Sequence, residues 1–213
     1  MNLKRKAQNV LRMLVQRYGS ERAKRNLWNE EFSAGKWNFL DATGEESVRS
    51  YVEKYAEHGA ILDLGCGSGT TGIELDPASY TYYTGVDISD VAIEKAKTRA
   101  REAGVADRRE HRSSDILTYV PERKYNVILF GDSIYYIPFA RIASMLSRYA
   151  AYLTDNGVFV VRLFDVSGKR RQIVDIIESH SSVVERHQNE QTQVCNIVFR
   201  PKAIACRLAC PHE

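Results

Sequence analysis

The chain has no long apolar segment and no pattern of paired cysteines. No apolar run approaches the roughly 18 residues that a membrane-spanning helix needs, and the N-terminus lacks the apolar core of a secretory signal peptide. The four cysteines are scattered, so we expect a reducing, cytoplasmic setting rather than a disulfide-stabilised one.

The sequence also lacks a metal-binding pattern. None of the five histidines pairs with another at metal-ligand spacing in a helix. Near the end of the chain, Cys206, Cys210 and His212 supply three potential ligands, but a structural zinc site needs four. We therefore predict no metal site and interpret residues 201–213 as a tail.

The N-terminal segment is basic, although the net charge of the whole chain is only +3. A helix over residues 3–18 would gather its apolar side chains on one stripe, formed by Leu3, Ala7, Val10, Leu11, Leu14, Val15 and Tyr18. The remaining surface is cationic, and Gly19 and Ser20 then end this helix and cap the next. Such a helix can lie on an anionic membrane, bind a polyanion, serve as a transit peptide or pack its stripe on the domain.

A glycine-rich turn is the most informative stretch. The apolar run 61–64 carries one acid, Asp63, and is followed by glycines at 65, 67 and 69. Glycines between a strand and a helix let the backbone approach a ligand closely. The dinucleotide fingerprint needs its third glycine one place later, and Asp63 would repel a pyrophosphate. A ligand with a cationic end suits this turn better.

This D-x-G-x-G-x-G arrangement resembles motif I of the class I S-adenosylmethionine-dependent methyltransferases. The resemblance implies S-adenosylmethionine as cofactor and S-adenosylhomocysteine as product. It places Asp63, Gly65, Cys66, Gly67 and Gly69 at the cofactor.

Two further acids follow strands in the order that a nucleoside site requires. Asp87 ends a strand 22 residues after Gly65, where an acid accepts hydrogen bonds from ribose hydroxyls, and Ile88 follows it. In the resembled family, an acid at the position of Asp115 accepts the adenine amino hydrogen, and the next residue, here Ile116, packs on the ring. Ligands of open α/β sheets bind outside the carboxyl ends of the strands, and these positions share that edge.

The segment after the next strand carries the candidate catalytic residues. It lacks the [DNS]-P-P-[YF] tetrapeptide of one group of nucleic-acid methyltransferases. It resembles instead the N-E-x-L-Y-Y segment of small-molecule O- and N-methyltransferases, with Gly131 and Asp132 in place of Asn and Glu. A hydroxyl acceptor needs a base, and Asp132 is our candidate, while Tyr135 and Tyr136 would shape the acceptor pocket. The alternatives are that Asp132 caps a helix and that the tyrosines only pack.

An aromatic cluster precedes the nucleotide-type domain, between Trp28 and Leu40. In many small methyltransferases a similar W-x-x-x-[FY]-x-x-G-x-[WY] segment folds over the cofactor, which places Trp37 at the site. The alternative is that these aromatic residues only anchor an N-terminal helix.

Strand and helix signals alternate through the rest of the chain. We expect helices over 44–57, 89–103, 139–153 and 169–179, and strands over 80–87, 109–113, 125–130 and 158–164, with a turn at 155–157 and a final antiparallel pair at 183–186 and 194–199. This pattern predicts an α/β fold: a Rossmann-like, seven-stranded, mostly parallel sheet with helices on both faces. Residues 1–43 would form a helical cap, 44–200 the cofactor-binding domain and 201–213 the tail.

The function expected from these features is methyl transfer from S-adenosylmethionine to a small molecule, at oxygen rather than nitrogen. A sugar, a glycan or a secondary-metabolite intermediate, anionic or carrier-linked, would suit the basic helix. The alternatives are an RNA or protein methyltransferase that uses this helix, and a cofactor-binding protein without chemistry. Peripheral membrane contact through residues 3–25 also stays open, as does the oligomeric state.

Overall fold

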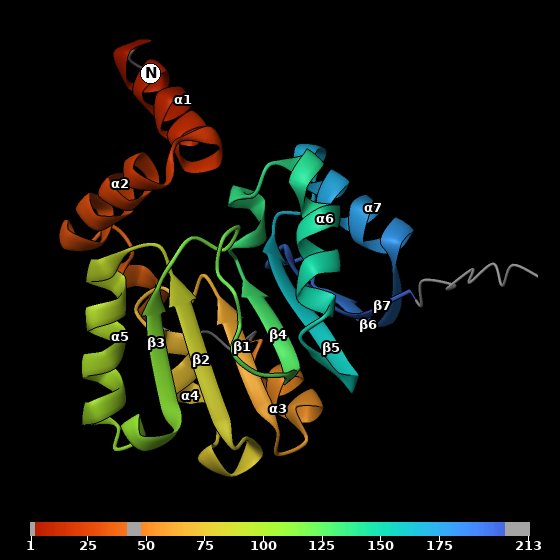
Figure 1. Ribbon diagram of the computed structural model, residues 1–213. Coiled ribbons are helices and arrows are strands. Elements are labelled where there is room, and N and C mark those ends of the chain that lie inside the picture. The colour runs from red at the N-terminus through yellow and green to blue at the C-terminus, as the bar shows by residue number, and fades with distance from the viewer. Residues whose placement is uncertain (1–2, 42–47, 203–213) are drawn as a thin grey trace, which may run out of the picture.

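The computed structural model describes residues 3–41 and 48–202 (Figure 1). The predicted tail, with Cys206, Cys210 and His212, lies outside this part of the chain. Among the described residues no helix is long and apolar enough to cross a membrane. The same residues contain no group of three or more potential ligands that could hold a metal ion.

A single seven-stranded sheet organises the molecule, in the order β3-β2-β1-β4-β5-β7-β6. Its strands are β1 Ala60–Leu64, β2 Tyr82–Asp87, β3 Arg109–Ser113, β4 Tyr125–Gly131, β5 Leu153–Phe164, β6 Ser181–Gln188 and β7 Val194–Pro201. The first five strands pair in parallel, whereas β7 pairs antiparallel with β5 and β6. The chain order reverses between β1 and β4, the kind of position at which open α/β sheets bind ligands. The predicted Rossmann-like fold is confirmed.

Helices cover both faces of the sheet. Those of the sheet domain are α3 Arg49–Ala56, α4 Thr70–Glu74, α5 Asp90–Glu102, α6 Phe139–Ala150 and α7 Arg171–His180. One buried cluster joins α3 to β1, β4 and β5, and the other joins α6 and α7 to the opposite side of the same strands. Short 3-10 turns span Asn38–Asp41, Pro77–Ser79, Ala106–Arg108, Ile134–Tyr136 and Gly168–Arg170.

The sequence predictions around the start of β5 are wrong. The helix predicted over 139–153 ends at Ala150, and Leu153 already belongs to β5. Residues 155–157 were expected to form a turn before a strand, but they lie inside β5. The pairing of β4 with β5 shifts register between Tyr125 and Val127, so the extra residues of β5 bulge out of the ladder. A bulge accommodates turn-forming residues without ending the strand. Of the helix predicted over 44–57, residues 44–47 lie outside the described part of the chain. Within the described part, α3 begins at Arg49.

Two helices form a cap above the sheet (Figure 1). They are α1 Leu3–Tyr18 and α2 Glu21–Ser33, and the hydroxyl of Ser20 caps α2 by accepting from the Ala23 N–H at 3.3 Å. The alternative that the apolar stripe of α1 packs on the domain is wrong, because Val10, Leu11, Leu14 and Tyr18 are 50–64% exposed. The opposite, polar side of α1 faces the domain instead, as the contacts of Arg12 and Arg17 show below.

Candidate active site

A cavity of about 460 Å³ lies between the cap and the carboxyl edge of the sheet. Eleven of the predicted site residues line it: Trp37, Gly65, Gly67, Asp87, Ile88, Asp115, Ile116, Gly131, Asp132, Tyr135 and Tyr136. They come from four separate loops and from the cap, so the parallel strands bring distant sequence positions to one place.

Three predicted residues do not line this cavity. Asp63 is 2% exposed and its carboxylate accepts from the Tyr83 hydroxyl at 2.7 Å. Burial raises the pKa of Asp63 to about 7 and also raises the pKa of the Cys66 thiol. Gly69 precedes α4 with a φ of 81°, and a Cβ there would lie 2.9 Å from the Ala96 Cβ. These residues support the glycine turn from beneath.

The first and third glycines of the turn, Gly65 and Gly69, have no room for a side chain. Gly65 has a φ of 87°, and a Cβ on it would stand 2.4 Å from the Cβ of Ser133. The Ser133 hydroxyl in turn donates to the Leu64 carbonyl oxygen at 2.5 Å. Gly67 opens toward the cap, since a Cβ there would meet the Phe32 ring at 3.5 Å. Any larger residue at 67 would project into the space between the turn and α2.

Asp87 connects the glycine turn to the start of α5. Its two carboxylate oxygens accept from the backbone N–H groups of Gly67, at 3.0 Å, and Ser89, at 2.8 Å. Burial raises the pKa of Asp87 to about 6, although these hydrogen bonds oppose the shift. A carboxylate has about four acceptor directions, so Asp87 keeps capacity to accept from the hydroxyls of a ligand in the cavity.

Asp115 has a partner that the sequence analysis missed. The ammonium of Lys24, on α2, lies 3.1 Å from its carboxylate, and both side chains are only 10% exposed. The Leu117 N–H donates to the other carboxylate oxygen at 2.9 Å. Lys24 belongs to a run of basic residues in the sequence, and nothing in that run marks it as the buried one. The pair ties the cap to the loop after β3.

Aromatic side chains cover the cavity as a lid formed by Trp28, Phe32, Trp37 and Tyr136. Trp28 packs edge-on against Tyr136 with ring centroids 4.9 Å apart, and Trp37 lies 5.3 Å from Trp28. The buried carboxylate of Glu31 holds this lid: it accepts from the indole of Trp37 at 3.1 Å and from the guanidinium of Arg12 at 2.9 Å. The lid therefore depends on α1 as well as on α2.

Asp132 stands at the centre of a polar cluster on the far side of the glycine turn. It has a φ of 57°, and its carboxylate pairs with Arg162 and accepts from the Tyr135 hydroxyl at 2.6 Å. Strained backbone of this kind gathers at functional sites. The alternative that Asp132 caps a helix is wrong, because the following turn starts after Ser133 and α6 starts after Pro138. Burial raises the pKa of Tyr135, so its hydroxyl stays a neutral donor.

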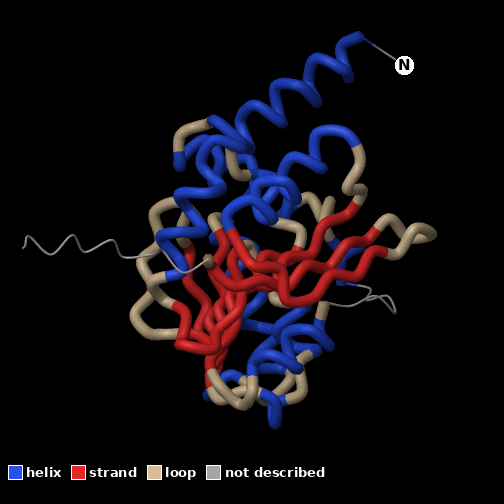
Figure 2. The backbone as a smooth tube through the Cα atoms, turned by 90° about the vertical axis from the view of Figure 1, so that its right-hand side faces the viewer, coloured by secondary structure: helices blue, strands red, loops and turns tan. Residues whose placement is uncertain are grey.

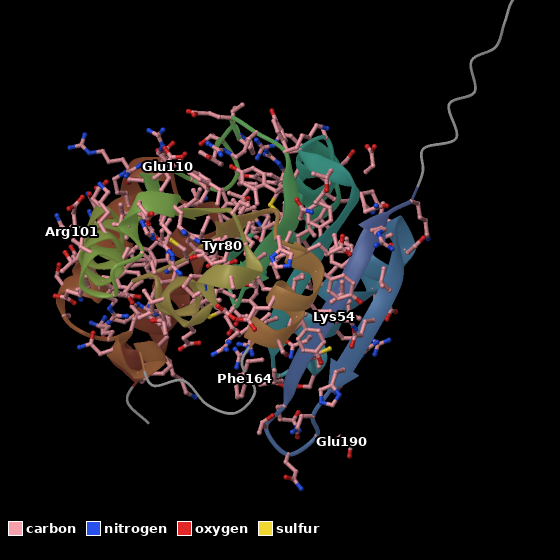
Figure 3. All side chains as sticks on the ribbon, turned by 90° about the horizontal axis from the view of Figure 1, so that it is seen from below. Lys54, Tyr80, Arg101, Glu110, Phe164 and Glu190 are labelled. Atoms are coloured by element: carbon pink, nitrogen blue, oxygen red, sulfur yellow. The ribbon has the colours of Figure 1, made fainter. Side chains whose placement is uncertain are left out.

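Sequence reasoning also missed Arg162 and Gln16. Arg162 lies on β5 opposite Gly131; a lone charge inside an apolar strand was a usable signal, since a buried charge needs a partner. Gln16, on α1, lines the cavity at 5% exposure, and its amide nitrogen has no hydrogen-bond partner. Phe39 and Phe164, the latter labelled in Figure 3, also line the cavity and are 65% and 49% exposed.

The cavity suits S-adenosylmethionine along its length. Asp115 and Ile116 offer an acceptor and an apolar surface for adenine, and Asp87 offers acceptor oxygens for the ribose. The bare backbone at Gly65 and Gly67 leaves space for the methionine part, which a Cβ at 67 would narrow. Asp132, Tyr135 and Tyr136 line the rest of the cavity, next to Arg162.

Comparison with known proteins supports this assignment. Residues 62–159 match a family model described as a methyltransferase domain. The chain is 29% identical over 119 residues to 27-O-demethylrifamycin SV methyltransferase of Amycolatopsis mediterranei, covering 53% of this chain and 44% of that one. It is 37% identical over 73 residues to the mRNA cap guanine-N(7) methyltransferase of Schizosaccharomyces pombe, covering 32% and 18%. The matched segments thus span less than half the length of these curated relatives.

A solved structure agrees over most of the fold. The N-methyltransferase NodS of Bradyrhizobium japonicum, in complex with S-adenosylhomocysteine, superposes with a TM-score of 0.67 at 18% identity, over 84% of this chain and 98% of that one. Fold, motif order and family model coincide on the same strands. Residues 62–159 are therefore a methyltransferase domain with the class I fold, and S-adenosylmethionine is the cofactor of this domain.

Proposed function

We propose that this protein transfers a methyl group from S-adenosylmethionine to a hydroxyl oxygen of a small molecule. The observation that carries the proposal is the continuity of the cavity, which runs from Asp87 and Asp115 past the glycine turn to the paired Asp132 and Arg162. A cavity of about 460 Å³ that also holds the cofactor leaves space for a compact acceptor or for one end of a larger one.

When bound, S-adenosylmethionine supplies an electrophilic methyl group on its sulfonium. The residues of this chain bind the cofactor, exclude water and accept the acceptor proton. Asp87, Asp115 and the glycine turn hold the cofactor in line with the acceptor, and the aromatic lid keeps water out; in-line displacement depends on this alignment. Asp132 accepts the proton of the acceptor hydroxyl, while Arg162 and Tyr135 hold its carboxylate in place.

The Asp132 cluster favours oxygen over nitrogen as the acceptor atom. A neutral amine attacks without losing a proton first, whereas a hydroxyl needs a base because its own pKa is far above neutral. A carboxylate held by two donors, with acceptor directions left over, suits that task. The name of the rifamycin relative places its methyl group on oxygen, which agrees with this choice. Sugars, glycans and secondary-metabolite intermediates are acceptors of the expected kind.

A second candidate is an RNA acceptor. Its support is the 73-residue similarity to an mRNA cap methyltransferase and the basic character of residues 3–25. Two of those basic residues, Lys24 and Arg12, form ion pairs within the molecule, with Asp115 and Glu31. Because an electrostatic footprint on RNA needs free cations, this candidate ranks second.

The test is to incubate the purified protein with methyl-labelled S-adenosylmethionine and fractionated cell extract. We expect label in the small-molecule fraction, carried on oxygen as judged by the NMR shift of the methyl carbon. Label in RNA or in protein would contradict the proposed small-molecule acceptor. Label on nitrogen would contradict the proposed acceptor atom. Heat-inactivated protein and the Asp132→Asn variant serve as controls.

A further inference from the structure

The apolar face of α1 has no partner in the described part of the molecule. Val10, Leu11, Leu14 and Tyr18 are 57%, 63%, 50% and 64% exposed. Their spacing places all four on one side of the helix. Scattered apolar side chains are common at protein surfaces, but a continuous exposed patch marks an interaction site.

The orientation of α1 is set by its opposite side. Arg12 pairs with Glu31, and Arg17 donates to the Tyr135 carbonyl oxygen at 2.7 Å and lies over the Phe139 ring at 4.2 Å. Gln16 is buried between these contacts, at 5% exposure. While the helix covers the cavity in this way, its apolar stripe has to face outward. Figures 1 and 2 agree that α1 extends away from the body of the molecule with its N-terminal end outermost.

The charge beside the stripe has one sign. Residues 3–20 contain five basic residues and no acid, and the first acid of the chain is Glu21. Two of the five, Arg12 and Arg17, face the domain. Lys6 and, on α2, Arg22 are exposed. A helix with an apolar face and a cationic polar face lies in the interface of a membrane, where anionic headgroups attract the cations. Tyr18 ends the stripe, and tyrosine is enriched at the level of the headgroups.

We propose that α1 docks this protein on a membrane surface rich in anionic lipids. A second copy of the chain fits the stripe less well, because pairing two such helices would bring cations together with no acid on either helix to offset them, and like charges in contact are destabilising. An anionic bilayer satisfies both the stripe and its basic border. Docking through the outer side leaves Arg12, Gln16 and Arg17 on the lid, so the cavity stays covered. The proposal does not depend on which acceptor the enzyme methylates.

The test is co-sedimentation of the full chain with vesicles of phosphatidylcholine alone or mixed with phosphatidylglycerol. We expect the wild type to bind the mixed vesicles about tenfold more strongly than the neutral ones. The double variant Leu11→Ser/Leu14→Ser should lose about tenfold or more of that binding. Lys4→Gln/Lys6→Gln should remove most of the preference for anionic lipid.

A matched control lies on β6, where Val183 and Val184 are each 41% exposed. Val183→Ser/Val184→Ser removes exposed apolar surface far from α1 and should leave vesicle binding unchanged. All variants should keep the wild-type affinity for S-adenosylhomocysteine, which shows that they fold and separates this test from that of the proposed function. Absence of wild-type binding, equal binding by the Leu11/Leu14 variant, or a dimer that the Leu11/Leu14 substitutions abolish without any vesicle binding would overturn the proposal.

Discussion

The two halves of the cavity are built in different ways. The cofactor half, as we propose it, consists of residues at or just after strand ends, between Gly65 and Ile116. The acceptor half, as we propose it, combines side chains from the cap, from the loop after β4 and from β5. Gln16 and Arg162, far apart in the sequence, both line this cavity. The cofactor half thus depends on sheet topology, whereas the acceptor half depends on how a helical cap packs. The cap also contacts the cofactor half, because Lys24 of α2 pairs with Asp115.

The acids at and beneath the cavity also differ in their partners. Asp63 and Asp87 rely on hydroxyl and backbone donors, and burial raises the pKa of both. Asp115 and Asp132 each have a cation as a partner, the ammonium of Lys24 and the guanidinium of Arg162. The following four substitutions test this contrast, from the largest expected effect to the smallest.

The largest effect is expected at the proposed base. Asp132→Asn should lower the turnover of methyl transfer by about 10²–10³-fold, the range of general acid–base catalysis, because an amide cannot take the acceptor proton. Binding of S-adenosylhomocysteine, measured by titration calorimetry, should change less than about threefold, since Asp132 lies in the acceptor half. Tyr135→Phe, which removes only one donor to Asp132, should cost less. Full turnover in Asp132→Asn would show that another group is the base.

Asp87→Ala should have the converse effect on the cofactor half. Loss of hydrogen bonds to a charged acceptor costs about 2–3 kcal/mol, so affinity for S-adenosylhomocysteine should fall roughly 30- to 150-fold by calorimetry. Glu94→Ala, an exposed acid on α5, is the control and should bind normally. An unchanged affinity in Asp87→Ala would remove Asp87 from the ribose site.

Asp63→Asn probes a buried acid that the cavity does not reach. The pKa of Asp63 in the folded state, about 7, lies above its ordinary 3.8, so its contribution to stability is complete below about pH 3.8 and is lost as the pH rises through 7. The asparagine has no charge to desolvate and can still accept from Tyr83. We expect the free energy of unfolding at pH 8 to rise by about 2 kcal/mol, and the gain to shrink toward pH 4, as measured in urea.

Asp155→Asn, at an exposed acid on β5, is the control for that series. Equal stability of Asp63→Asn and wild type at pH 8 would argue against a buried ionised Asp63. A tenfold loss of S-adenosylhomocysteine affinity in Asp63→Asn would instead support the expectation that this acid serves the cationic end of the cofactor.

The smallest effect on stability is expected at Gln16. A buried amide without a partner costs about 1–3 kcal/mol, so Gln16→Leu should raise the free energy of unfolding by about 1 kcal/mol while raising the KM for the acceptor. Gln8→Leu, on the exposed part of α1, should do neither. If Gln16→Leu weakened the binding of S-adenosylhomocysteine and left the KM for the acceptor unchanged, Gln16 would belong to the cofactor half.

Much of the cofactor half could be predicted from the sequence because its signals are local. The glycine turn, Asp87 and Asp115 each follow a strand that its own residues identify, and parallel strands end at one edge by construction. The register bulge in β5 could not be predicted, because residues 155–157 favour a turn. The strand continues past them only because Leu153 before the bulge and Val158 after it both pair with β4. The partners Lys24 and Arg162 also required the structure, since their contacts span 91 and 30 residues.

The sequence by itself determined that residues 3–18 form an amphipathic, basic helix, and that a glycine turn, Asp87 and Asp115 stand at strand ends in a set order. Only the tertiary structure decided which side of that helix faces inward. Hydrophobicity alone predicts a buried stripe, but the bonds of Arg12 and Arg17 to Glu31 and the Tyr135 carbonyl hold the polar side on the cavity. The apolar side is turned outward because a rigid helix cannot present both faces to the same site.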